Sequence, residues 1–388
     1  MHLKTRNVNT AWRELITGLH EGRIPTEVQS SRAGEVLVVE EPVILTYEKP
    51  RERVLFSAAR DANPFFHLYE ALWMLAGRND VRALSYYNGR MKEFSDDGNT
   101  FNAAYGERWR RVPWYGGTEL DQLGQIVKHL SRNPISRRAV LTMWDIEKDL
   151  VNIEQSKDLA CNTHAYFAIE DPGSGPRRLN LTVCNRSNDL VWGMLGANVV
   201  HFSILQEYLA CRLGLEVGVY NQFTNNLHVY TALWDANIDR WLGDMTSEKW
   251  GGGYYIEWSV PLVTNPQVFD REVQDFVEYH SSVQDASVDS VAQKEKPWTE
   301  PFLMLVAHPL CMAWHCHKFR RYDLAHRWAS LCHAEDWNVA ARGWLWRREA
   351  ALEAKLAKRP TNRGTESLRS LDSSELGERF LKEKGLDP

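Results

Sequence analysis

The chain has few cysteines, no long apolar run and no large excess of either charge. Its 388 residues include six cysteines and carry a formal net charge of −5. Six cysteines are too few for a disulfide scaffold, so we expect free thiols in a reducing, cytoplasmic setting. No stretch reaches the ~18 apolar residues of a membrane helix, and residues 1–19 lack an apolar signal core. The acidic balance argues against an extended nucleic-acid surface, although a local arginine cluster could still bind one phosphate.

Helical and strand patterns alternate along the first 230 residues. Hydrophobic residues make up 44% and charged residues 25%, as in an ordinary soluble globular protein of one or two domains. Helical spacing predicts helices that start near Asn9, span 65–76 and 120–130, and cover 198–212. β-branched runs predict strands at 35–46 (with a proline break), 139–144, 164–169, 179–184 and 216–223. This mixture predicts an α+β domain built on one large sheet.

The C-terminal part has a different composition. Residues 299–358 are rich in Trp, His and Ala at helical periods, and residues 359–388 are polar and charged. We expect a helical appendage over residues 286–358 and a flexible tail over residues 359–388. The run HPLCMAWHCHKF from His308 has Cys and His at helical spacing, which could bind zinc. Its spacing fits no zinc module, and Trp314 and Phe319 favour a packed helix, so we expect no metal site.

Cys161 is a candidate nucleophile. It lies after a polar loop at the start of a predicted strand, and Arg186 is a plausible neighbour across the sheet. A nearby cation lowers the pKa of a thiol and so favours the reactive thiolate. The alternative for Cys161 is a buried, inert cysteine, and Cys184 and Cys211 lie in apolar runs that favour the core.

Arginines also precede two other predicted strands. Arg137 and Arg138 come directly before the strand at 139–144, and Arg32 lies in a short loop before the strand at 35–46. Two adjacent arginines are usually a solvated charge pair, but guanidinium groups also match the geometry of a phosphate. If these side chains and Arg186 converge, a small anionic ligand is the natural reason.

Several polar side chains could contact such a ligand. Glu70 lies in the apolar helix at 65–76, so it is either paired with an arginine or a carboxylate of raised pKa that orders water. Asn198 can donate and accept, which suits O4 and N3–H of uracil, but a helix N-cap is the alternative. His228 and Tyr230 share one face of a predicted strand. Their side chains either contact a sugar hydroxyl together or form a pair in the core.

Residues 31–230 resemble the thymidylate synthases and their hydroxymethylase relatives. The segment RSND at Arg186 is similar to the family's QRSxD motif, and NLHVY at 226–230 is similar to its GDxHxY motif. EALWMLAG from Glu70, YGERWR from Tyr105, SRR at 136–138 and SRAG at 31–34 resemble further motifs of the family. The resemblance implies a thymidylate synthase-like α+β fold, with one large mixed sheet and packed helices, over residues 1–285.

The resemblance also implies roles for particular residues. Cys161 would attack C6 of a pyrimidine, Glu70 would order water near the base, and Tyr105 would assist proton removal at C5. Without the resemblance, the sequence favours a packed turn tyrosine at Tyr105. Asp189 would bind the pterin of a folate, whereas without the resemblance the sequence favours an ordinary helix-capping or turn aspartate. The resemblance assigns the nucleotide to Arg32, Arg137, Arg138, Arg186, Ser187, Asn198, His228 and Tyr230. Arg137 and Arg138 would reach across the interface of a homodimer.

Departures from the family pattern bear on the product. Met91 stands where the family has a tryptophan that packs on the folate, and the terminal GLDP does not match the family's apolar tail. Both changes would admit water to the exocyclic methylene, which favours a hydroxymethyl over a methyl product. We therefore expect a 5,10-methylenetetrahydrofolate-dependent dUMP hydroxymethylase.

Three alternatives remain: a thymidylate synthase, a dCMP hydroxymethylase, and a non-catalytic nucleotide-binding relative. The expected ligand is dUMP or dCMP, with neither direct nucleic-acid binding nor a membrane. Hydroxymethylases of this kind are typical of bacteriophages that modify their DNA, so the resemblance implies a phage protein in the host cytoplasm.

Overall fold

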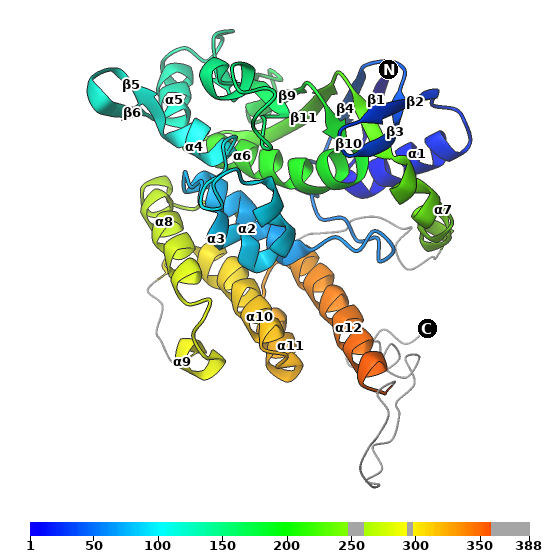
Figure 1. Cartoon of the computed structure of the whole chain (residues 1–388). Coiled ribbons are helices and arrows are strands. Elements are labelled where there is room, and N and C mark those ends of the chain that lie inside the picture. The colour runs from blue at the N-terminus through cyan, green and yellow to red at the C-terminus, as the bar shows by residue number, and fades with distance from the viewer. Residues whose placement is uncertain (247–259, 293–297, 358–388) are drawn as a thin grey trace, which may run out of the picture.

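The fold is built around a six-stranded mixed sheet (Figure 1), as predicted. The computed structural model describes residues 1–246, 260–292 and 298–357. The strand order is β1-β4-β11-β9-β8-β7, in which β1 pairs with β4, and β11 with β9, in parallel, and the other neighbours pair antiparallel. The strands are β1 (His2–Thr5), β4 (Val43–Tyr47), β7 (Val140–Thr142), β8 (Asn162–Glu170), β9 (Arg178–Asn185) and β11 (Glu216–Thr224).

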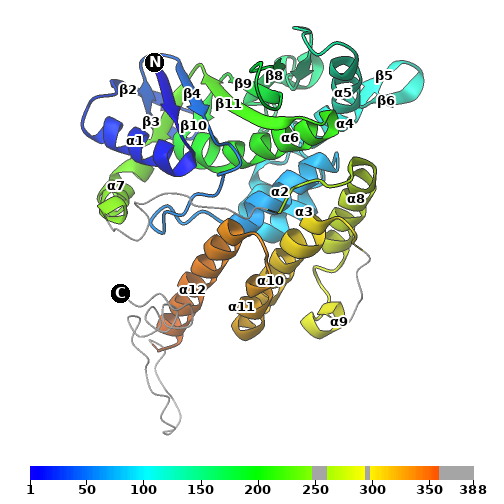
Figure 2. The same ribbon diagram turned by 180° about the vertical axis from the view of Figure 1, so that it is seen from behind.

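One face of this sheet is covered by helices. Along β9, Leu179, Leu181 and Val183 are fully buried, whereas the residues between them are only partly buried. The buried face packs on α6 (Asn198–Leu213), which is buried over most of its length and ends at Gly214 in the left-handed conformation. Figures 1 and 2 show α6 and α1 (Val8–His20) on the same side of the strands. The opposite face of the sheet stays partly open, so Cys184, which we expected in the core, is only partly buried.

A second, four-stranded sheet stands beside the first. It has the order β10-β12-β3-β2 and consists of β2 (Thr26–Ser31), β3 (Gly34–Val39), β10 (Asn188–Asp189) and β12 (Leu227–Tyr230). The predicted strand at 35–46 is in fact two strands in different sheets, because the chain turns before Pro42. β10 and β12 pair in parallel, so Asp189 lies opposite His228. Two candidate site residues from distant segments are thereby neighbours.

Helix α1 begins earlier than predicted. The side chain of Asn7 accepts a hydrogen bond from the backbone N–H of Thr10, so Asn7 caps the helix and Asn9 lies within its first turn. The partner of α1 is α7 (Thr231–Thr246), and the indoles of Trp12 and Trp241 meet edge to face at 5.3 Å.

Helix α2 (Pro64–Leu75) is the central helix of the molecule. It is capped by Asn63, starts with a proline at its first position and has almost every side chain buried, as predicted for 65–76. It approaches α4 (Tyr105–Arg110) so closely that a Cβ atom at Gly106 would lie 2.5 Å from the carbonyl oxygen of Met74. Glycine at 106 therefore sets the position of the neighbouring Tyr105. The other α-helices and β-strands between α2 and β7 are α3 (Val81–Tyr87), β5 (Val112–Trp114), β6 (Thr118–Leu120) and α5 (Gln122–Arg132).

The C-terminal helices lie on the side of α2 and α3 away from the large sheet (Figure 2), and several of them contact α2 directly. They are α8 (Pro266–Ser282), α9 (Val288–Ala292), α10 (His308–Lys318), α11 (Tyr322–Ser330) and α12 (Glu335–Ala357). The ring of Phe65 on α2 lies 5.7 Å from Trp314 and 5.6 Å from Trp344, so the aromatic residues of these helices join the main core. The tail predicted over residues 359–388 lies outside the described residues.

The His- and Cys-rich run at 308–319 forms the packed helix α10. Cys311 and Cys316 are buried, and burial raises the pKa of each thiol to about 12. Within the described residues, no group of three or more His, Cys, Asp or Glu side chains could hold a metal ion. Nor does any helix in these ranges have the length and apolar character needed to cross a membrane.

Candidate active site

A pocket lies between the four-stranded sheet, the start of β8 and the turn that precedes α6. It encloses about 1370 Å³, part of which is open to solvent. Among the residues predicted for the site, it is lined by Arg32, Tyr105, Cys161, Ser187, Asp189, Asn198, His228 and Tyr230. The structure therefore brings together most of the residues that the sequence singled out, although they are spread over almost 200 positions.

Cys161 lies directly before β8, at the wall of this pocket. The guanidinium of Arg186 lies 3.7 Å from its Sγ atom, and the Nε of Arg186 donates to the carbonyl oxygen of Ala160 over 2.8 Å. Burial raises the pKa of the Cys161 thiol, and the positive charge of Arg186 opposes this effect. Arg186 is thus fixed where it favours the thiolate, as predicted for a neighbour across the sheet.

Tyr105 holds the backbone on both sides of this thiol. Its hydroxyl oxygen accepts hydrogen bonds from the N–H groups of Cys161 and Asn162, both at 3.0 Å. Burial raises the pKa of Tyr105, so the phenol keeps its proton. Because the backbone bonds use only the lone pairs of the oxygen, the O–H proton remains available to a group in the pocket.

Asn198 is the first residue of α6, but it does not cap the helix. The N-cap position is Ala197, and the partners of the Asn198 side chain are other side chains, so the N-cap alternative is wrong. Instead, its Nδ2 donates to Oδ1 of Asn188 over 3.0 Å, and its Oδ1 accepts from Nδ2 of Asn162 over 3.4 Å. Asn188 lies within the RSND motif that we had identified, yet nothing in the motif had indicated that its side chain points at Asn198.

The two oxygens of Asp189 have different surroundings. Oδ1 caps the π-helix at Leu190–Ala197 by accepting from the backbone N–H groups of Val191 and Trp192 at 2.8 and 2.5 Å. Oδ2 is buried and has no hydrogen-bond partner in the described part of the chain. Burial also raises the pKa of Asp189. The expected capping role is therefore confirmed for one oxygen, while the other is available to a ligand.

Trp192 is a pocket residue that the sequence analysis missed. Its side chain is 44% exposed, and its ring centroid lies 5.9 Å from that of Tyr230. The signal was a tryptophan in an apolar run directly after the RSND motif, where a buried residue was the default expectation. An indole exposed beside Asp189 offers a flat apolar surface to an aromatic ligand.

The predicted arginines divide into two groups. Arg32 lines the pocket and Arg186 contacts Cys161, so both stand near one ligand site. Arg137 and Arg138 are exposed and are not among the residues that line the pocket. Within one chain, the four arginines therefore do not converge.

The structure does not place Glu70 or Met91 in the lining of the pocket. Glu70 is only 7% exposed, and its Oε2 lies 3.0 Å from Nε2 of His201, so its neighbour is a histidine rather than the arginine we considered. Met91 lies on a 3₁₀ helix, Gly89–Phe94, and is partly buried. His201 follows Asn198 by about one turn of α6, so Glu70 contacts the same helix close to Asn198.

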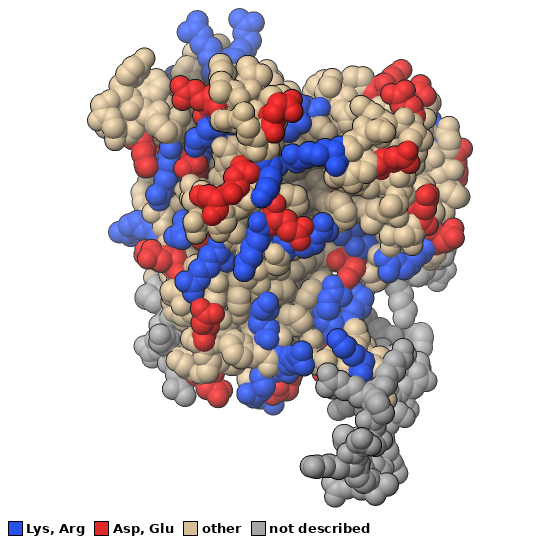
Figure 3. All heavy atoms as spheres, viewed as in Figure 1, with Lys and Arg blue, Asp and Glu red and all other residues tan. Residues whose placement is uncertain are grey.

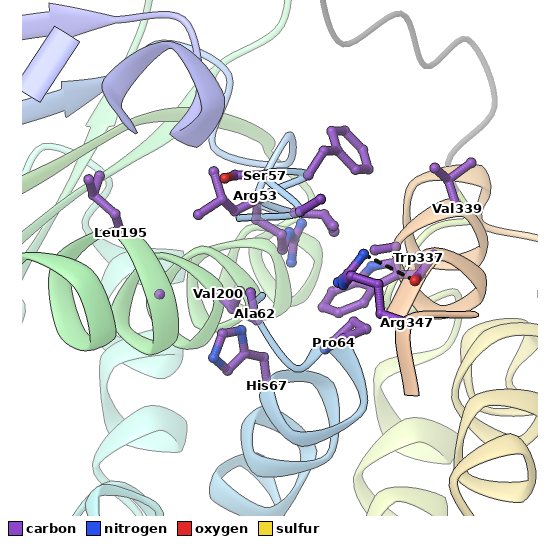
Figure 4. A pocket seen from close by; sticks show the side chains of 17 residues that line it. Arg53, Ser57, Ala62, Pro64, His67, Leu195, Val200, Trp337, Val339 and Arg347 are labelled. Atoms are coloured by element: carbon purple, nitrogen blue, oxygen red, sulfur yellow. Dashed lines mark hydrogen bonds between the residues drawn. The ribbon is translucent and has the colours of Figure 1, made fainter. Parts of the chain in front are cut away.

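A second cavity lies between the segment 53–64, the start of α6 and α12 (Figure 4). Its two arginines are already paired: Arg53 with Glu207, and Arg347 with Asp61 at 3.0 Å. Burial lowers the pKa of His67 well below its ordinary value, so this imidazole is neutral. The cavity contains none of the predicted site residues, and the candidate chemistry belongs to the first pocket.

Comparisons with known proteins agree with this geometry. The family model for thymidylate synthase matches residues 56–248. The chain is 40% identical over 368 residues to the deoxyuridylate hydroxymethyltransferase of Pseudomonas phage M6, covering 92% of this chain and 97% of the relative. It is 42% identical over 202 residues to the deoxyuridylate hydroxymethyltransferase of Bacillus phage SP01, covering 51% of each chain. It is 29% identical over 192 residues to the thymidylate synthase of Symbiobacterium thermophilum, covering 46% of this chain and 64% of the relative. The chain belongs to the thymidylate synthase family.

Proposed function

We propose that this protein is a folate-dependent deoxyuridylate hydroxymethyltransferase. It transfers a one-carbon unit from 5,10-methylenetetrahydrofolate to C5 of dUMP, and water completes the hydroxymethyl group. The proposal rests on one observation above all: Cys161, Tyr105 and Asn198 meet in a single pocket. The long alignment with the phage M6 relative supports this choice of substrate and product.

Cys161 is the nucleophile of the proposed reaction. Its Sγ adds to C6 of the uracil, which makes C5 electron-rich, and the thiolate is released when the product forms. Arg186 assists because its positive charge at 3.7 Å stabilises the thiolate before attack. The proton of the thiol passes to solvent.

Tyr105 and Glu70 serve the proton transfers. The phenol of Tyr105 stays protonated and can donate to the reacting region, with its oxygen fixed by the two backbone N–H groups. Glu70, which contacts His201 one turn after Asn198, orders water for the loss of the C5 proton and acts through that water, since it does not line the pocket itself.

The folate side of the pocket fits an aromatic pterin. The unpartnered, buried Oδ2 of Asp189 can accept from a ring N–H, and Trp192 provides a flat exposed surface next to it. When bound, the folate supplies a one-carbon unit at the oxidation level of formaldehyde. Met91 remains a proposed residue of this side, and the opening of the pocket to solvent supplies the water that adds to the carbon.

The nucleotide phosphate is bound by Arg32, Arg186 and Ser187 of one chain and by Arg137 and Arg138 of a second copy. The second copy is proposed because those two exposed arginines lie away from the pocket of their own chain. The partly open face of the six-stranded sheet, which carries His164, Tyr166, Thr182, Cys184 and Asn221, is the surface we propose for dimerisation. His228 and Tyr230 contact the sugar.

The homodimer has a direct test. Arg138→Ala and Cys161→Ala chains should each be inactive, but a mixture of the two should regain activity because a heterodimer has one site with both residues intact. Sedimentation of the protein as a monomer, or a mixture without activity, contradicts the shared site.

A small nucleotide, rather than extended nucleic acid, is the ligand we propose. Acidic and basic side chains are interspersed over the face in Figure 3, with basic groups around the hollow near its centre. An extended phosphate backbone would need a continuous basic surface. We place the enzyme in the cytoplasm of the host of a bacteriophage, in keeping with its phage relatives.

The reaction is tested with dUMP and methylenetetrahydrofolate. Hydroxymethylation predicts 5-hydroxymethyl-dUMP and tetrahydrofolate in equal amounts, identified by mass spectrometry. Stoichiometric dTMP and dihydrofolate would instead make the protein a thymidylate synthase, and turnover of dCMP alone would exclude dUMP as the substrate. Release of tritium from C5 of dUMP without folate tests the thiol addition separately.

A further inference from the structure

We propose that Gln222, a buried residue outside the pocket lining, fixes the orientation of the Asn198 carboxamide and thereby selects uracil over cytosine. This inference rests on the proposed function, because it assumes that a pyrimidine base meets Asn198. Gln222 lies on β11 and is completely buried. It acts as a positioning residue through a relay of side-chain amides.

The relay begins at an acceptor that cannot reverse its role. Nε2 of Gln222 donates to the backbone carbonyl oxygen of Met194 over 2.9 Å. The same Nε2 donates over 3.2 Å to the hydroxyl oxygen of Tyr47, whose own proton goes to the Met194 carbonyl oxygen, also at 3.2 Å. Burial raises the pKa of Tyr47, so that hydroxyl keeps its proton. Because a carbonyl only accepts, the amide nitrogen of Gln222 must face Met194 and its Oε1 must face the other way.

Each later step of the relay follows from the one before. Oε1 of Gln222 accepts from Nδ2 of Asn188 over 3.3 Å. Oδ1 of Asn188 then accepts from Nδ2 of Asn198 over 3.0 Å. Both asparagines are at least nine-tenths buried, and Nδ2 of Asn188 also donates to the hydroxyl oxygen of Thr224 over 3.4 Å. The orientation of Asn198 is therefore set by a backbone carbonyl three hydrogen bonds away.

Asn162 also bonds to Asn198, from the side of the thiol. Its Nδ2 donates to Oδ1 of Asn198 over 3.4 Å. A reversed Asn198 would turn its oxygen towards the oxygen of Asn188 and its NH₂ group towards the NH₂ group of Asn162, which loses both hydrogen bonds. To restore them, the whole relay would have to reverse, and Oε1 of Gln222 would then face the carbonyl oxygen of Met194. Buried acceptors that face each other are strongly disfavoured.

The fixed amide matches one base. With one N–H used by Asn188 and one lone pair used by Asn162, Asn198 still has one N–H donor and one acceptor lone pair. In uracil, O4 accepts and N3–H donates, so both groups pair with this orientation. In cytosine, N3 accepts and the 4-amino group donates, so the same contacts need the reversed amide, which the relay opposes.

The test compares two changes at one position. Gln222→Met has a similar length but neither donates nor accepts, so it frees Asn188 and Asn198 to reverse. Gln222→Glu, which burial keeps protonated, donates its O–H to the Met194 carbonyl oxygen and accepts from Asn188 with its other oxygen, so the direction of the relay is kept. Dissociation constants for dUMP and dCMP are measured by calorimetry at one salt concentration, without folate. We expect the preference for dUMP to fall at least about tenfold in Gln222→Met and to stay within about threefold in Gln222→Glu.

Gln206→Met is the matched control. Gln206 is equally buried and donates to the carbonyl oxygens of Leu179, Gly218 and Val219, but it is not connected to Asn198. It should lose stability as Gln222→Met does and keep the base preference. If Gln222→Met fails to fold, Asn188→Leu cuts the relay one step closer to the base and should also lower the preference.

The outcomes are distinct. An unchanged preference in a folded Gln222→Met protein, or equal losses in Gln222→Glu or Gln206→Met, would overturn the relay while leaving the proposed function intact. A wild-type protein that binds neither nucleotide, or prefers dCMP, would overturn the proposed base recognition itself.

Discussion

The active-site pocket and the C-terminal helices both depend on tryptophan, but they use it in opposite ways. Trp192 in the pocket is 44% exposed, whereas Trp314, Trp337 and Trp344 of the C-terminal helices are 4–5% exposed. The exposed indole lies beside an oxygen of Asp189 that has no hydrogen-bond partner among the described residues. The buried indoles of Trp314 and Trp344 pack on each other, and Trp314 packs on α2. An indole thus offers a surface for a ligand in one region and anchors a helix in the other.

Helix α2 connects the two regions. On one side it holds Glu70 against His201 of α6, and on the other it holds Phe65 against Trp314 and Trp344. Substitutions in the pocket should therefore alter catalysis with little effect on folding, and substitutions in the C-terminal helices should do the opposite. The predictions below test that separation, from the largest expected effect to the smallest.

Cys161→Ala should remove catalysis while leaving the fold intact. Without the thiol, no bond to C6 can form, so both product formation and tritium release from C5 should fall by at least roughly 10³-fold. The dissociation constant for dUMP should change little because the phosphate and base contacts do not use the sulfur. Retention of tritium release by this variant would show that another residue attacks the base.

The sequence predicted well those pocket residues whose positions follow from the pairing and periodicity of the strands. Arg186 was expected beside Cys161 because the two segments are adjacent in one sheet, and the structure confirms it. His228 and Tyr230 were expected on one face of a strand, and both line the pocket. In such cases the period of the strand decides the direction of the side chain.

Other features depend on tertiary contacts that no local pattern encodes. Glu70 meets a histidine because α2 crosses the start of α6, and Asn188 turns towards Gln222, 34 residues away in the chain. The helical character of 299–358 was predictable from its periodicity, but its packing against α2 was not. Long-range partners of buried polar side chains are what the sequence analysis missed.

Trp314→Ala should have the largest effect on stability. The indole is 5% exposed and packs on Phe65, Tyr87 and Trp344, so its removal leaves a large cavity. We expect a loss of about 3–5 kcal/mol in the free energy of unfolding. The kcat of the folded fraction should be nearly unchanged. Phe319→Ala, at the exposed end of the same helix, is the control and should shift stability by roughly 0.5 kcal/mol or less. A Trp314→Ala protein that is stable but inactive would contradict the separation of the two regions.

Arg186→Gln should make Cys161 harder to deprotonate. The arginine charge lowers the pKa of the thiol, so its removal raises that pKa, and less thiolate exists at any pH below it. The rate of alkylation of Cys161 by iodoacetamide should fall several-fold at mildly alkaline pH, and its pH profile should move to higher pH. Arg186→Lys keeps the positive charge, so its alkylation rate and pH profile should lie between those of the wild type and those of Arg186→Gln. The buried thiols of Cys311, Cys316 and Cys332 serve as unreactive internal controls. A profile that moves to lower pH would contradict the assigned role of the arginine.

One contact does connect the C-terminal helices to the part of the pocket that contains Asp189. Asp61 has a positive φ of 54° and pairs with two arginines of α12: Arg347 at 3.0 Å and Arg348 at 2.6 Å. The adjacent Arg60 donates through Nε and Nη2 to the carbonyl oxygen of Val191, two residues beyond Asp189. Burial lowers the pKa of Arg60 to about 10, and the charges of Asp189 and Asp61 oppose this effect. Figure 4 shows Arg347 extending from α12 towards this segment.

Arg348→Met should therefore have a small effect that is specific to the folate. Loss of one ion pair loosens the strained Asp61 and lets Arg60 shift against Val191, which displaces the cap formed by Asp189. We expect the KM for methylenetetrahydrofolate to rise about two- to fivefold while the KM for dUMP and the folate-independent release of tritium stay constant. Because both partners are about one-third exposed, the loss of stability should stay below about 1 kcal/mol. Lys355→Met, on the exposed end of the same helix, should alter none of these quantities. Equal changes in the two KM values would show that α12 acts on the whole fold, and unchanged values would show that the Asp61 contact does not reach the pocket.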